Sequence, residues 1–93
     1  SNHYIYVMKA DRYKEVLENT TNREWTIVNN TPENVQLTSG CYTLKVSLFS
    51  PQYNQLNFEL VDRASNQVYS KKGVKQTSTH YTSEFQEFIA DNT

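Results

Sequence analysis

The chain has 93 residues, of which 37% are hydrophobic and 13% aromatic, and its formal net charge at pH 7 is −1. This length fits one domain with a single core, and the aromatic content argues against a disordered chain. A net charge this close to zero offers no field that recruits nucleic acid or an anionic membrane, so neither is expected as a partner. No apolar run reaches the roughly 18–20 residues that cross a bilayer, which argues against membrane insertion.

The ends and the cysteine content say little about the compartment in which the chain works. The chain opens with Ser1-Asn2 in place of methionine, which is typical of the scar left when an expression tag is removed. The single Cys41 excludes a disulfide within the chain, so cysteine usage gives no sign of an oxidising environment. The abundance of threonine, asparagine, glutamine, serine and tyrosine favours a secreted, periplasmic or cell-surface location.

The N-terminal part contains one predicted strand and one ambiguous segment. Residues 4–9 are rich in aromatic and β-branched side chains, which favours a strand. Residues 10–18 carry apolar side chains at helical spacing behind a possible cap at Asp11, but the same residues could continue the first strand. This segment is therefore open between helix and strand.

Two short strands are predicted before Gly40. Residues 24–28 place Trp25 and Ile27 on one side of a strand, and turn-prone residues follow it. Residues 35–37 form the second strand, which leads into a turn at Gly40.

The clearest alternation of apolar and polar side chains follows this turn. The apolar positions are Tyr42, Leu44, Val46 and Leu48, and the polar positions between them are Thr43, Lys45 and Ser47. A period of two predicts a half-buried strand, which Pro51 ends.

A hairpin is predicted after this proline. Apolar side chains stand at every second position from 56 to 60, a polar turn covers residues 62–66, and a return strand covers residues 67–70. The Lys-Lys-Gly sequence at residues 71–73 predicts a second turn, in which Gly73 takes a positive φ.

The C-terminal segment favours a helix. Residues 83–86 match a capping box, and three apolar side chains lie at helical spacing behind it, which predicts a helix over residues 83–90. A strand that begins at Tyr81 is the competing interpretation. If that strand forms, it leaves an unpaired edge, which predicts a homodimer through edge pairing or a partner strand supplied in trans.

Short strands at regular spacing predict a mainly β fold: a small antiparallel β-sandwich with a jelly-roll or immunoglobulin-like cadence, in a single domain over residues 1–93. One short helix near the N- or C-terminus completes this prediction. The pattern Gly40-x-Tyr42-x-Leu44-x-Val46 resembles many secreted or cell-surface β-sandwich modules, which implies the same fold and location. The expected core residues are Trp25, Ile27, Tyr42, Leu44, Val46, Leu48, Leu56, Phe58 and Leu60.

Catalytic and metal-binding signatures are weak. Cys41 and His80 are the candidate nucleophile and base, because a thiol needs a neighbouring imidazole to ionise at neutral pH. Neither residue lies in a recognisable catalytic motif, so an inert thiol is the preferred interpretation. No spacing of histidine, cysteine or carboxylate residues predicts a metal site, and no cofactor is expected.

Four residues form the candidate ligand-binding set: Tyr53, Tyr69, His80 and Tyr81. Aromatic rings flanked by amides stack on sugars or anchor protein interfaces, although the same rings could simply fill cross-strand pairs. The sequence therefore predicts a non-catalytic, extracytoplasmic binding or accessory module that presents loops and tyrosines to a protein or glycan partner. The alternatives are a small thiol-dependent enzyme that uses Cys41 and His80, and a structural subunit of a surface assembly.

Overall fold

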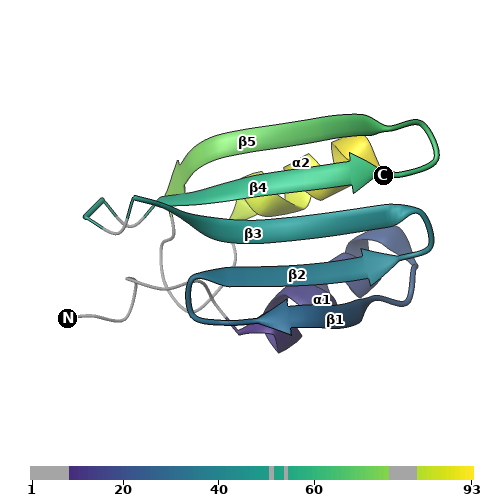
Figure 1. Ribbon diagram of the computed structural model, residues 1–93, viewed down its shortest axis with the longest axis horizontal. Helices are drawn as coiled ribbons and strands as arrows, with labels where there is room; N and C mark the ends of the chain where they lie inside the picture. Colours follow the sequence, from purple (N-terminus) through teal and green to yellow (C-terminus); the bar gives the residue numbers. More distant parts are fainter. Residues whose placement is uncertain (1–8, 51, 54, 76–81) are drawn as a thin grey trace.

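The computed structural model describes residues 9–50, 52–53, 55–75 and 82–93. The elements in chain order are α1 (Ala10–Thr21), β1 (Thr26–Asn30), β2 (Asn34–Ser39), β3 (Tyr42–Ser50), β4 (Gln55–Asp62), β5 (Gln67–Lys75) and α2 (Ser83–Asn92). The strands form one open antiparallel sheet in the order β1-β2-β3-β4-β5, and both helices lie against the same face of it (Figure 1). In this arrangement β1 and β5 are the two edge strands.

The predicted mainly β class is confirmed, but the predicted sandwich or jelly-roll is not shown. In the described part of the chain, the layer that faces the sheet is made of α1 and α2 rather than of a second sheet. The physical reason is that both helices have an apolar stripe that the alternating apolar face of the strands can bury. These stripes contain Tyr13, Val16 and Leu17 in α1, and Phe85, Phe88 and Ile89 in α2.

The segment left open between helix and strand is helix α1. Its first turn follows Lys9, which makes no side-chain cap hydrogen bond, and the expected cap Asp11 lies inside that turn. A carboxylate in the first turn still favours the helix through its dipole. The helix ends at Asn22, whose φ of 56° is left-handed and whose backbone N–H donates to the Glu18 carbonyl at 3.2 Å.

The helix predicted at the C-terminus is confirmed as α2, with its cap one residue earlier than the expected box. The Thr82 hydroxyl accepts a hydrogen bond from the Phe85 backbone N–H at 3.3 Å. The Phe85 ring then packs edge-to-face on Phe58 of β4, with ring centroids 4.9 Å apart. This contact fixes α2 to the sheet.

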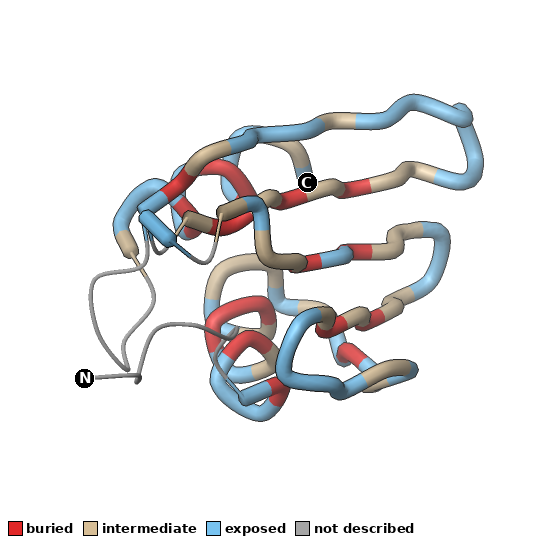
Figure 2. The backbone as a smooth tube through the Cα atoms, turned by 60° about the vertical axis from the view of Figure 1, so that its left-hand side comes forward, coloured by how far each residue is buried: buried red, intermediate tan, exposed pale blue. Residues whose placement is uncertain are grey.

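Most of the predicted core is buried. Figure 2 shows buried positions alternating with less buried ones along the central strands. Trp25, Leu44, Val46, Leu56, Phe58 and Leu60 are buried, while Ile27, Tyr42 and Leu48 are partly buried against the same cluster. Polar side chains predominate on the opposite face of the sheet, where Val68 is 54% exposed. No described helix or strand lies over this face (Figure 1). Its central row runs across Gln36, Lys45 and Glu59.

The turn predicted at residues 71–73 is wrong, because these residues continue β5. The register with β4 shifts there, so that Lys72 and Gly73 lie opposite the single residue Asn57. This irregularity is a β-bulge, and Gly73 has the expected positive φ, at +72°. The strand predicted at residues 4–9 lies outside the described residues except for Lys9.

Candidate functional site

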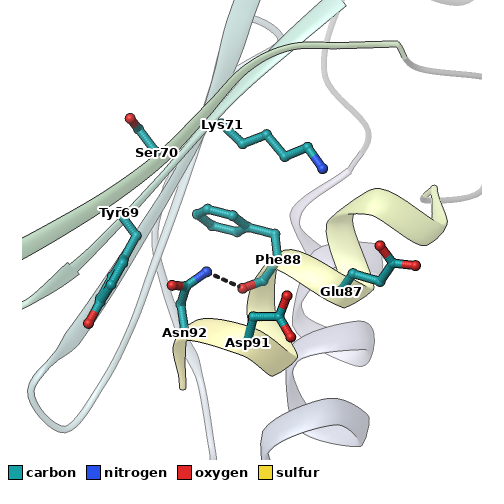
Figure 3. Close-up of a pocket in the computed structure, with 7 residues that line it drawn as sticks. All are labelled: Tyr69, Ser70, Lys71, Glu87, Phe88, Asp91 and Asn92. Atoms are coloured by element: carbon teal, nitrogen blue, oxygen red, sulfur yellow. Dashed lines mark hydrogen bonds between the residues drawn. The ribbon is translucent and has the colours of Figure 1, made fainter.

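A groove opens between the edge strand β5 and helix α2, and we call it the β5–α2 groove (Figure 3). Its volume is about 300 Å³. It is lined by Tyr69, Ser70, Lys71, Glu87, Phe88, Asp91 and Asn92. Because β5 is the last strand of the sheet, this groove runs beside backbone groups that no described strand pairs.

Strand β5 forms one wall of the groove through alternate residues. In Figure 3 the side chains of Tyr69 and Lys71 extend on the α2 side of the strand, whereas Ser70 points away. This alternation is the two-residue period of a strand. Tyr69 is partly buried against the core, so its ring is held in place, while Lys71 is exposed.

Helix α2 forms the other wall. Phe88 is buried on the sheet side, where its ring centroid lies 5.9 Å from that of Phe58, while Glu87 and Asp91 are exposed. The Asn92 side-chain amide donates to the Phe88 carbonyl at 2.7 Å, which ties down the last turn of the helix (Figure 3). The groove therefore has an apolar inner part and a charged rim.

The rim is predominantly acidic. The pKa of Glu84, at the start of α2, lies below its usual value. The main cause is the hydrogen bond from its own backbone N–H, followed by the Thr82 hydroxyl and a smaller contribution from the Lys71 charge. Among the described residues, the only ion pair within 4.0 Å joins Arg12 and Glu15, which both lie on α1. Glu87 and Asp91 therefore have no paired cation in this part of the chain.

The edge strand β5 is regularly paired with β4 only over a short length beside the groove. Residues 67–71 of β5 pair with β4 in regular register, opposite residues 58–62. The bulge at Lys72 and Gly73 then interrupts the ladder. Bulges twist an edge strand and limit pairing to the regular stretch before them. The available edge is thus five residues long.

The predicted tyrosines do not all meet at this site. Tyr69 lines the groove, whereas Tyr53 lies in the connection between β3 and β4 and is 63% exposed. That connection is at the opposite end of the strands from the β4–β5 turn (Figure 1). His80 and Tyr81 lie outside the described residues.

Cys41 occupies an exposed turn. With Gly40, whose φ is +57°, it forms the two-residue loop between β2 and β3. Its carbonyl accepts a hydrogen bond from the Arg63 backbone N–H at 2.7 Å, which joins this loop to the β4–β5 turn. Its expected partner His80 is not among the described residues. In the described part of the chain, no three histidine, cysteine or carboxylate side chains gather as metal ligands.

The α2 wall was missed as a binding surface in the sequence. Glu87 and Asp91 are four residues apart, a spacing that places both on one side of a helix behind the capping box. That spacing was the available signal, but the position of β5 beside it could not be read from the helix alone.

Comparison with protein-family models, with curated proteins and with solved structures gives no match to this chain. Neither described helix has the length and apolar character needed to cross a membrane. The groove and the strand edge beside it are therefore the features from which a function is inferred.

Proposed function

We propose that this chain is a non-catalytic binding module that takes up an extended segment of a protein partner along the edge of β5. The single observation that carries the proposal is the β5 edge, which no described strand pairs, next to a groove between that strand and α2. In this mode of recognition, main-chain hydrogen bonds to the edge provide affinity, and alternate side chains of the added strand enter the pocket and provide specificity.

The dimensions of the edge suit a short segment. Residues 67–71 offer five residues in regular register, which corresponds to about 17 Å of extended chain. In an added strand of this length, two or three side chains point to the α2 side. There they meet the Tyr69 ring and the exposed side of α2.

A protein segment fits the site better than a glycan. A sugar platform requires exposed rings that lie close together. Tyr53 lies in the connection between β3 and β4, whereas Tyr69 lies near the start of β5, at the other end of the strands. An extended peptide can use both the backbone groups of β5 and the groove. The secreted, periplasmic or cell-surface location remains a prediction from composition.

The proposal is tested with a phage library that displays random nine-residue peptides, selected on the immobilised chain. We expect selected peptides to bind the free protein with micromolar dissociation constants and to lose about tenfold or more in affinity with Tyr69→Ala. Tyr53→Ala is the matched control, because it removes an equally large ring outside the groove, and we expect it to leave affinity unchanged.

Two outcomes would overturn the proposal: a library that yields no peptide above background, or peptides that depend on Tyr53 and not on Tyr69. If Tyr69→Ala loses its fold by circular dichroism, the selected peptides are mapped on the unmodified protein by amide chemical shifts. Shifts centred on β5 and α2 support the proposal, and shifts centred elsewhere contradict it.

A further inference from the structure

We infer that the segment bound in the β5–α2 groove is basic, and that one lysine or arginine side chain of it lies between the carboxylates of Glu87 and Asp91. This inference rests on the proposed function and specifies its partner. The occupant is a short extended stretch of another protein that carries this basic residue.

The charged side chains that line the groove favour a basic partner. Glu87 and Asp91 are exposed neighbours on one side of α2, and like charges four residues apart on a helix repel each other. Lys71 is the cation in the lining, and its charge also acts on Glu84 at the start of α2. Within the lining, two carboxylates thus stand against one ammonium group, so a cation from the partner is favoured and an anion is disfavoured.

The rings in the groove favour a side chain with a long aliphatic part. A lysine or arginine side chain buries its aliphatic stem on apolar surface while its charged end stays near water. Here Tyr69 and Phe88 form the apolar part, and the two carboxylates stand at the rim (Figure 3). A cation beside the Tyr69 ring gains a further attraction from the ring face.

A second copy of this chain is a poorer occupant. Antiparallel pairing of two β5 strands across a two-fold axis would bring each acidic α2 rim toward its counterpart, because both helices lie on the same face of the sheet. The charges therefore favour a different chain with a basic segment.

The test uses two blocked seven-residue peptides that alternate threonine and valine and carry either lysine or glutamate at the centre. Binding is measured by fluorescence anisotropy at low and at high salt. We expect the lysine peptide to bind about five to ten times more tightly than the glutamate peptide, and the difference to shrink at high salt. The double variant Glu87→Lys/Asp91→Lys should reverse the preference. The control Glu24→Lys/Glu33→Lys has the same change in net charge at two exposed positions outside the groove. This control should keep the preference for the lysine peptide.

The outcomes separate this inference from the proposed function. Equal affinity for both peptides, with binding still dependent on Tyr69, overturns the basic occupant and leaves the binding module intact. Failure of both peptides, together with a library that yields no binder, overturns both claims. Concentration-dependent dimers that disappear with Tyr69→Ala would make a second copy the occupant and overturn the inference.

Discussion

The ring of Tyr13 meets the ring of Phe85 edge-to-face, with centroids 5.2 Å apart and planes inclined by 74°. This contact joins α1 to α2, two elements from opposite ends of the chain. Phe85 also contacts Phe58 of β4, so one side chain connects both helices and the sheet. The layer that covers the sheet is therefore organised around Phe85, which is fully buried.

Truncation of Phe85 is expected to be among the most destabilising changes. Phe85→Ala should lower the free energy of unfolding by about 3–5 kcal/mol, because it removes buried surface and leaves a cavity. Phe85→Leu should cost about 1–3 kcal/mol, since it keeps apolar bulk but loses two ring contacts worth about 0.5–1.5 kcal/mol each. Urea unfolding followed by circular dichroism measures both. Phe49→Ala is the control: Phe49 is 53% exposed, and we expect a change within about 0.5 kcal/mol.

A second prediction concerns the connection from α1 to β1. The Thr21 hydroxyl donates to the Leu17 carbonyl at 2.6 Å and accepts the indole N–H of Trp25 at 3.0 Å. Thr21→Val keeps the shape but leaves the indole N–H of a buried ring without this acceptor, so unfolding free energy should fall by about 1–3 kcal/mol. Thr20→Val makes the same exchange one residue earlier in α1, and an equal loss there would contradict the role of the hydrogen bond.

The central strands could be predicted from the sequence, because the alternation of apolar and polar side chains indicates which residues face the core. Leu44 and Leu60 are buried as expected, and Lys45 between such positions is exposed. The strand sequences do not indicate which element covers this face, because the apolar stripe of a helix and a second sheet bury it equally well. The spacing in residues 10–18 fitted both, and only packing of Tyr13 against α2 decides for the helix.

The groove was harder to predict than the fold. Tyr69 could be singled out because an aromatic ring among polar residues is conspicuous. Glu87 and Asp91 could not be singled out in this way, because their significance depends on β5, which precedes them in the chain as a separate element. The edge was also obscured, because Gly73 suggested a turn where the strand in fact continues through a bulge.

This bulge leads to a third prediction. A Cβ at position 73 would meet ordinary contacts only, the nearest being 3.6 Å from the Gln55 side chain, so space does not exclude a side chain. The positive φ does impose a cost: Gly73→Ala should destabilise by about 1–2 kcal/mol, whereas Gly73→Asn should cost less because asparagine tolerates this region. Thermal unfolding of both variants checks this order, and equal stability would contradict the left-handed conformation.

The start of α2 gives a prediction about pH. Thr82→Ala should raise the pKa of Glu84, because it removes a hydrogen bond to the carboxylate, and should cost about 1 kcal/mol through loss of the Phe85 cap. Because the folded pKa is lowered, the stability contributed by Glu84 is present above its unfolded pKa and is lost as pH falls through the folded value. Carbon-13 NMR titration of the Glu84 carboxyl measures the shift. Ser83→Ala should shift this pKa less, since its hydroxyl contributes least.

The central claim, that a partner segment adds to β5 beside α2, is tested most directly by amide hydrogen exchange with and without the lysine peptide. If the segment adds as a strand, alternate amides within residues 67–71 should exchange at least about tenfold more slowly in the complex, because their edge N–H groups become hydrogen-bonded. The other edge strand, β1, should be unchanged. Binding that protects β1, or that leaves residues 67–71 exchanging at their free rates, would contradict the account.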